Sequence, residues 1–225
     1  MKKATMILTA LFIVGLLAST ASAYNISFTT ATDADGVYTT ERTDAYVWDF
    51  NDPDDPLGTR PSIFASIDHN DAAVVTGSKS GKYAAPYIFT ENAPDLTPYL
   101  SVPEENSNGV GSFKVSLSQR ADYFGMLWGS VDSYNALNFF QNGSLVESLA
   151  GDDIVNPANG NQTGSLHNVY VNLTGFEFDQ FELVSTNFAF EVDNIAVAPV
   201  PEPGTFVLMG LGLAGLAGMR KKFRK

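Results

Sequence analysis

The feature that most constrains the fold of this chain is a two-residue alternation of apolar and polar side chains through its middle. Residues 113–118 read Phe-Lys-Val-Ser-Leu-Ser, and residues 169–173 read Val-Tyr-Val-Asn-Leu. Successive side chains of a β-strand point to opposite faces, so this alternation predicts strands with one face in a core. No long stripe with the 3.6-residue period of a helix occurs between residues 24 and 200. The body of the chain is therefore predicted to be all-β.

Turn signals separate these segments at short intervals. The strongest is Asn142-Gly143, which lies between the apolar runs 137–140 and 145–147 and is typical of a two-residue hairpin. Short strands at this spacing predict a β-sandwich, and we expect residues 24–199 to form a jelly roll. Four further turn pairs support it: Asp35-Gly36, Asn108-Gly109, Asn159-Gly160 and Thr174-Gly175.

The last strand of the body is predicted to contain a β-bulge. Alternate residues from 188 to 192 are apolar, and so are Ile195 and Val197, which have the opposite parity. One extra residue at Asp193-Asn194 would place both sets on the core face. Two other segments are predicted to be loops because of their turn-forming residues: 51–61 and 93–111.

Composition excludes several functional classes. The chain has no cysteine, which excludes disulfides, cysteine-ligated zinc and a cysteine nucleophile. Between Tyr24 and Val200 there are six basic and 24 acidic residues, a net charge of −18. Such a body repels phosphate backbones, so we expect no nucleic-acid partner.

The N-terminus has the three parts of a secretory signal peptide. Met1-Lys2-Lys3 carries positive charge, residues 6–18 form an apolar run, and a small-residue cleavage site follows at Ala21 and Ala23. As a helix the run would be about 20 Å long, shorter than the roughly 30 Å hydrocarbon core of a bilayer. We therefore predict export with removal of residues 1–23, rather than an uncleaved anchor.

The C-terminus has a second pattern of three parts. Pro201-Glu202-Pro203 precedes an uncharged apolar run at 205–219. As a helix this run would be about 22 Å long, and basic side chains at its end could extend it across a bilayer. We expect a short transmembrane helix with the acidic body outside the cytoplasm. A basic tail closes the chain: Arg220, Lys221, Lys222, Arg224 and Lys225.

These three parts, in this order over residues 200–225, resemble the PEP-CTERM sorting signal. The resemblance implies a Gram-negative bacterium that makes extracellular polysaccharide, and an exosortase that recognises Pro-Glu-Pro and removes the tail. The protein would be held in the inner membrane in transit and delivered to the cell surface or extracellular matrix. Residues 123–140 and 188–197 are also similar to exosortase-dependent surface proteins, a family with no assigned chemistry.

We expect no enzymatic activity from the body. It has two histidines, His69 and His167, and no serine in a Gly-x-Ser-x-Gly elbow, so a hydrolase triad has no anchor. A glycosidase needs only two carboxylates, but 24 acidic residues nominate no pair. A cleft that held two converging carboxylates with raised pKa values would favour a hydrolase instead.

Calcium is the one cofactor that we consider, because it binds carboxylate, amide and carbonyl oxygens without histidine or cysteine. Asp193-Asn194-Ile195 resembles the last strand of galactose-binding-like jelly rolls, in which a structural calcium ion joins an early loop to the final strand. That resemblance implies a site formed by Asp49, Asn51 and Asp193. The alternative is that these residues form turns and bind no metal.

Aromatic side chains offer a second kind of site. Sugar-binding modules stack pyranose rings on exposed aromatic rings, and Trp48, Trp128 and Tyr134 are the candidates. Core packing is the alternative for both tryptophans. Two functions follow: a non-enzymatic exported surface or matrix protein, or a carbohydrate-binding module that recognises the exopolysaccharide.

Overall fold

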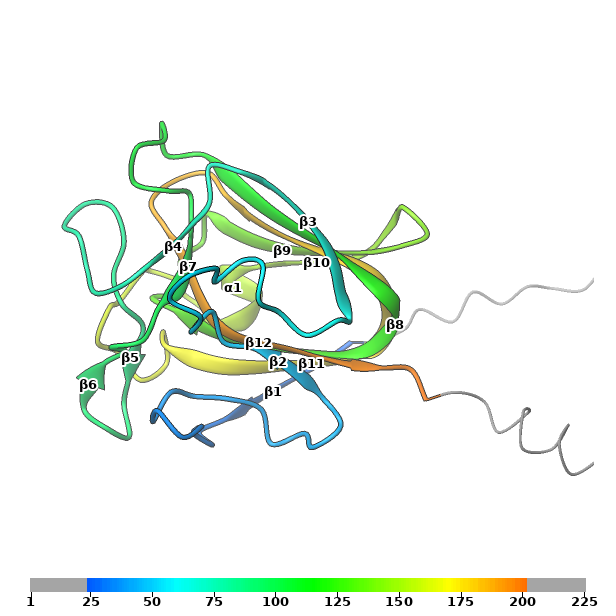
Figure 1. The fold of residues 1–225 in the computed structure, drawn as a ribbon. Coiled ribbons are helices and arrows are strands. Elements are labelled where there is room, and N and C mark those ends of the chain that lie inside the picture. The colour runs from blue at the N-terminus through cyan, green and yellow to red at the C-terminus, as the bar shows by residue number, and fades with distance from the viewer. Residues whose placement is uncertain (1–23, 202–225) are drawn as a thin grey trace, which may run out of the picture.

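Two long strands, β8 (Gly111–Gly129) and β11 (Val169–Ser185), organise the fold (Figure 1). The computed structural model describes residues 24–201. β8 and β11 pair antiparallel along almost their full length, and the register shifts between Thr174 and Gln180. On either side of this shift the two strands have different neighbours. Each long strand therefore contributes one half to each layer of a sandwich.

The first layer has the order β3–β8–β11–β9–β10. It joins β3 (Phe64–Asn70), β9 (Asn135–Gln141) and β10 (Ser144–Ala150) to one half of each long strand. Asn142 and Gly143 connect β9 to β10 with φ angles of 51° and 77°. Positive φ at both positions is what a type I′ hairpin requires. The predicted hairpin is therefore confirmed.

The second layer is built around β12 (Phe190–Pro199), which pairs with the other half of β8. β12 also pairs with β7 and β2, while β1 pairs with β11. A separate hairpin joins β5 to β6, and one short helix, α1, follows β10. The remaining elements are β1 (Asn25–Thr29), β2 (Tyr46–Trp48), β4 (Ala73–Val75), β5 (Tyr87–Ile88), β6 (Ala93–Pro94), β7 (Tyr99–Val102) and α1 (Gly151–Ile154).

The two layers enclose one main apolar core. Its centre is a cluster of phenylalanines, in which the Phe124 ring centroid lies 5.1 Å from Phe139 and 4.9 Å from Phe181. The alternating segments supply core side chains as expected: Phe113, Val115, Leu117, Val171 and Leu173 are buried. The prediction of an all-β sandwich is confirmed.

The bulge predicted in the last strand is present. The register of β12 against β8 shifts between Asp193 and Ala196, and Asn194 has a φ of 47°. Val192 and Ile195 are consequently both buried in the core although their parities differ. The Asn194 amide fixes the bulge by donating to Asp33 Oδ2 at 2.8 Å and to a backbone carbonyl.

The loop predicted at 51–61 contains no strand. The loop predicted at 93–111 is wrong in part, because Ala93–Pro94 forms β6 and Tyr99–Val102 forms β7 between β12 and β4. All four residues of β7 are buried. A strand buried on both faces shows no alternation, and a run of this length between prolines gives no other signal.

Several sequence predictions fall outside the described residues. They are the signal cleavage site at Ala21 and Ala23, the apolar run 205–219 and the basic tail. Of the sorting motif, only Pro201 is described. Between residues 24 and 201, no helix has the length and apolar character needed to cross a membrane.

Candidate functional site

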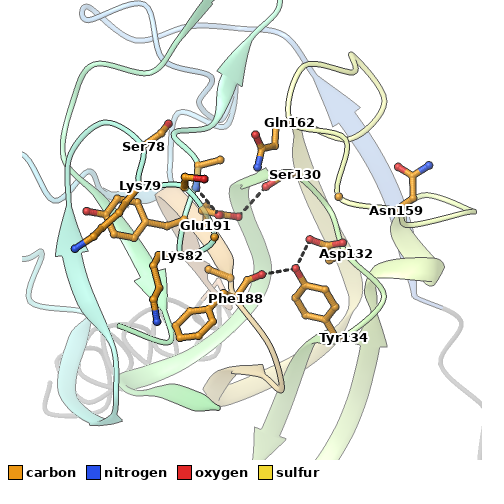
Figure 2. Close-up of a pocket in the computed structure, with 16 residues that line it drawn as sticks. Ser78, Lys79, Lys82, Ser130, Asp132, Tyr134, Asn159, Gln162, Phe188 and Glu191 are labelled. Carbon is orange, nitrogen blue, oxygen red and sulfur yellow. Dashed lines mark hydrogen bonds between the residues drawn. The ribbon is translucent and has the colours of Figure 1, made fainter. Parts of the chain in front are cut away.

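A polar cavity of about 480 Å³ lies where β8 ends and β12 begins (Figure 2). Four segments form its walls: the turn 78–84, the segment 130–134, the loop 159–160 with Gln162, and residues 188–191. Most of its side chains carry oxygen or nitrogen atoms. The polar members are Ser78, Lys79, Ser80, Lys82, Tyr83, Ser130, Asp132, Tyr134, Asn159, Gln162 and Glu191.

Glu191 joins two of these walls from its position on β12. Its Oε1 accepts a hydrogen bond from the Ala84 amide at 2.8 Å, and its Oε2 accepts one from the Ser130 hydroxyl at 2.8 Å. The side chain is buried, with 2% of the residue exposed. Burial raises the pKa of Glu191 to about 8, against the opposing effect of these two hydrogen bonds. The carboxyl group is therefore mostly protonated at neutral pH.

Asn168 holds the adjoining loops in place. Its Oδ1 accepts hydrogen bonds from the backbone amides of Ser130 and Tyr87, both at 3.0 Å. Its Nδ2 lies 3.2 Å from three carbonyl oxygens of the segment 161–164. Ser130 has a φ of 38°, a left-handed conformation that is costly for serine. The Asn168 and Glu191 contacts stabilise it there.

Asp132 and Tyr134 form a second polar pair on the cavity wall. The Tyr134 hydroxyl oxygen lies 2.6 Å from Asp132 Oδ2 and 2.6 Å from the Phe188 carbonyl oxygen. Burial raises the pKa of Asp132. A tyrosine has one proton to donate, so these two oxygens are alternative acceptors of it. A Cβ at Gly160 would lie 2.4 Å from Asp132 Oδ1, so this approach requires glycine.

Two lysines line the cavity with different partners. Lys79 forms an ion pair with Glu105. Lys82 Nζ lies 3.8 Å from the centroid of the Phe188 ring. Figure 2 shows these two side chains next to each other. Such a contact is a cation–π interaction. Lys82 forms no ion pair with any residue of the described range.

Both tryptophans are core residues, which corrects their assignment as candidate sugar platforms. Trp48 is 1% exposed, and its indole donates to the Pro56 carbonyl at 3.0 Å. Trp128 is fully buried and stacks on Phe190 at 4.4 Å. Of the three candidate aromatics, only Tyr134 lines the cavity. Their burial follows from the large apolar area that a tryptophan removes from water.

Phe188 is an aromatic ring of the cavity that the sequence pattern misplaced. Its parity matches that of core residues in β12, but it precedes the strand and is half-buried. Glu191 is a second cavity residue that the sequence analysis did not nominate. The signal that could have found it is a glutamate in an otherwise apolar strand, because a buried carboxyl needs bonding partners.

The predicted calcium ligands lie around a separate polar cluster at the bulge of β12. Asp193 is 1% exposed and Asp95 is 2% exposed. Burial raises the pKa of both carboxyl groups, and the negative charge of Asp95 raises that of Asp193 further. The Thr97 hydroxyl donates to Asp95 Oδ1 at 2.6 Å and lies 3.4 Å from Asp193 Oδ2.

Two buried oxygens of this region lack a hydrogen-bond partner among the described residues: Asp95 Oδ2 and Asn51 Oδ1. Carboxylate and amide oxygens are the atoms that calcium binds, so the chemistry of these residues fits the ion. Asp49 is exposed, and its Oδ1 accepts from the Asn51 amide at 3.3 Å. Within residues 24–201, no three acidic or histidine side chains gather as a metal-binding group. The calcium site stays a prediction, with Asp95 as the ligand that the sequence did not nominate.

A second cavity, of about 440 Å³, has mainly apolar walls. Phe28 and Phe89, each 53% exposed, and Leu166, 69% exposed, contribute to it. Its lining includes no acidic or basic side chain. It is therefore the alternative location for an apolar ligand, whereas the first cavity suits a polar one.

A family model of the PEP-CTERM protein-sorting motif matches residues 199–222. The match begins at the last residue of β12 and confirms the resemblance noted in the tail. The motif indicates an exported protein that an exosortase processes and that is sorted to the cell surface. The match covers the tail and leaves the function of the β-sandwich open.

The body of the chain has more distant likenesses. No curated protein matches the chain. Among solved structures, it is similar to CBM32-3 from a family 31 glycoside hydrolase from Clostridium perfringens. That similarity has a TM-score of 0.33 and 9% identity, and it covers 61% of this chain and 94% of that chain. A likeness at this level says nothing about what this chain binds.

Proposed function

We propose that this protein is a non-enzymatic surface or matrix protein whose β-sandwich binds a saccharide of the exopolysaccharide in the polar cavity. An exosortase would process the chain near Pro201-Glu202-Pro203 and so release it from the inner membrane. The observation that supports binding is the cavity itself. Its walls present amide, hydroxyl and ammonium groups beside three half-buried aromatic rings, those of Tyr83, Tyr134 and Phe188. Polar groups that converge on a concave site can fix the orientation of a bound ligand.

Several polar side chains of the cavity are available to a ligand. The side chains of Ser80, Asn159 and Gln162 are exposed and make no hydrogen bond within the described part of the chain. An amide can donate and accept at once, which matches the paired donor and acceptor character of sugar hydroxyls. These three residues come from two different loops. A saccharide could therefore be held from two sides.

Two carboxyl groups with raised pKa values share this cavity, the arrangement that would favour a hydrolase. Glu191, however, is 2% exposed and uses both oxygens to hold Ala84 and Ser130. Asp132 is engaged with Tyr134. Catalysis needs a carboxyl oxygen that reaches a water molecule or a leaving group. Both carboxyl groups form hydrogen bonds within the fold, and this supports the proposal of a non-enzymatic protein.

A calcium ion at Asp95, Asp193 and Asn51 would have a structural part in this account. It would neutralise two buried carboxylates and supply a partner for the orphaned oxygens. It would also fasten the loop after β2 to the bulge of β12. The saccharide cavity does not use these three residues.

The binding proposal is tested by calorimetric titration of the full-length chain in detergent with neutral and acidic oligosaccharides. We expect saturable binding that the variant Ser80→Trp abolishes, because an indole at this exposed position would fill the cavity mouth. Ser144→Trp, on the exposed start of β10, is the matched control and should bind normally. Absence of binding, or equal binding by both variants, would refute the proposal.

The sorting proposal has its own experiment. Replacing Pro201, Glu202 and Pro203 by alanine in an exosortase-bearing host should leave the full-length chain in the inner membrane. The unchanged chain should appear outside the cell with a mass that lacks the basic tail. Release of the alanine variant at the same mass would contradict processing at this motif.

A further inference from the structure

Two of the six basic residues of the body line the polar cavity. Only six lie between Tyr24 and Val200, against 24 acidic residues, and two of the six line this cavity. The acidic groups that face them are Asp132, Glu191 and the Glu105 partner of Lys79. The body has a net charge of −18, so its surface potential is negative. Two cations on one concave surface make the potential there less negative.

Lys82 differs from four of the other five basic residues of the body in its partners. Arg42, Arg120 and Lys79 form ion pairs with carboxylates. Arg60 donates to backbone carbonyls near the start of β3. Lys82 is half-buried and forms no ion pair within residues 24–201, so its charge lies beside Phe188 without a carboxylate partner.

Hydrogen bonds of the surrounding chain hold the backbone at Lys82 in place. Its backbone amide donates to the Lys79 carbonyl at 3.0 Å, and Lys79 pairs with Tyr83 across the turn. Ala84, two residues after Lys82, donates a hydrogen bond from its backbone amide to Glu191. A group that is already ordered loses less freedom when a ligand binds.

The backbone of Phe188 is held on the other wall, and its ring lies next to Gly109. Its carbonyl oxygen accepts from Tyr134, and a Cβ at Gly109 would lie 3.4 Å from the ring. The ammonium and the ring therefore lie together on two cavity walls whose backbones are held by hydrogen bonds (Figure 2). An ammonium binds a carboxylate through charge-assisted hydrogen bonds, and an aromatic ring offers an apolar face to a pyranose.

We infer that the cavity is specific for an acidic saccharide and that Lys82 binds the sugar carboxylate beside Phe188. This inference rests on the proposed function, because it names the class of sugar that the cavity takes. The amides of Asn159 and Gln162 would take the hydroxyl groups. A neutral sugar would leave the half-buried ammonium without an ionic partner and so bind less tightly.

The test compares an oligogalacturonate with its carboxyl-reduced neutral counterpart, by calorimetric titration of the full-length chain. We expect the acidic sugar to bind at least about tenfold more tightly, the size of one charge-assisted hydrogen bond. Lys82→Gln should remove this preference, so that the acidic and the neutral sugar bind this variant with the same affinity. Lys82→Arg should retain most of the preference, and the melting temperature of each variant checks its fold.

Lys114→Gln is the matched control. Lys114 Nζ lies 4.2 Å from the Phe140 ring centroid, so it is also a lysine over a phenylalanine, but it does not line the cavity. This variant has the same change in net charge and should keep the preference. If it loses the preference as Lys82→Gln does, the effect belongs to the net charge and the inference is wrong.

The remaining outcomes separate the inference from the proposed function. Equal affinity for both sugars, unchanged in Lys82→Gln, would overturn the acidic specificity and leave saccharide binding intact. No binding of either sugar would overturn the proposed function and this inference with it.

Discussion

At the scale of single residues, the cavity depends on polar groups that folding removes from water. Glu191 is the clearest case, because its two hydrogen bonds do not offset the cost of burying a charge. The folded chain therefore favours the protonated carboxyl. The buried acid links the turn 78–84 to β8 and makes stability depend on pH.

The pH dependence has a definite sign. The pKa of Glu191 is about 8 in the folded chain, whereas the ordinary value of 4.5 applies to the unfolded chain. Between these values the unfolded chain loses a proton that the folded chain retains, so stability falls as pH rises. The slope from one such group is at most about 1.4 kcal/mol per pH unit.

Glu191→Gln keeps an oxygen for the Ala84 amide and removes this titration. The quantity to compare is the unfolding free energy of this variant minus that of the unchanged chain. We expect this difference to be larger at pH 8.5 than at pH 5. Urea unfolding at both pH values measures it. Glu182→Gln, a half-buried position on β11, should show no such rise. A difference between the Glu191 variant and the unchanged chain that is equal at both pH values would contradict the raised pKa.

At the scale of elements, the bulge of β12 decides which side chains enter the core. The extra residue, Asn194, lets Val192 and Ile195 both point inward and lets Asp193 lie against Asp95. Its positive φ favours glycine or asparagine, and its amide adds bonds to Asp33 and to the Tyr38 carbonyl.

Asn194→Ala should destabilise the chain by roughly 2–4 kcal/mol, because it combines the cost of a left-handed alanine with two lost hydrogen bonds. Asn194→Gly loses the same bonds but tolerates the φ angle, so it should be the more stable of the two. Chemical denaturation of both variants measures the order. An alanine variant as stable as the glycine variant would contradict the account of the bulge.

Local signals predicted the elements that depend on neighbours in sequence. The Asn142-Gly143 hairpin and the bulge at Asn194 both follow from short patterns, and both are present. β7 could not be predicted, since a short strand buried on both faces has no alternation. The cavity also could not, because it combines the end of β8 with the turn 78–84 and two further segments that only the folded chain brings together.

At the scale of the whole molecule, the acidic body has two places where the charged groups differ from those of the exposed surface. One is the cavity with Lys79 and Lys82, and the other is the buried pair Asp95 and Asp193. Two carboxyl groups buried side by side are costly unless a proton or a cation neutralises them. Asp95 Oδ2 has no hydrogen-bond partner among the described residues, which favours a cation.

Calcium should therefore raise the melting temperature relative to chelator, since an ion that binds only the folded chain stabilises it. At an ion concentration one hundred times its dissociation constant, the gain would be about 2.7 kcal/mol. Asp95→Asn should abolish the calcium effect. Asp54→Asn, an exposed position of the loop 51–61, should retain it. A melting temperature that is identical in calcium and chelator would show that no calcium site forms.

The location of the saccharide is the central claim, and amide chemical shifts test it most directly. The full-length chain, labelled with nitrogen-15, would be titrated with oligosaccharides in detergent. We expect shift changes to gather at residues 78–84, 130–134, 159–162 and 188–191, which line the polar cavity. Changes confined to Phe28, Phe89 and Leu166 at the apolar cavity, or no changes at all, would contradict the account.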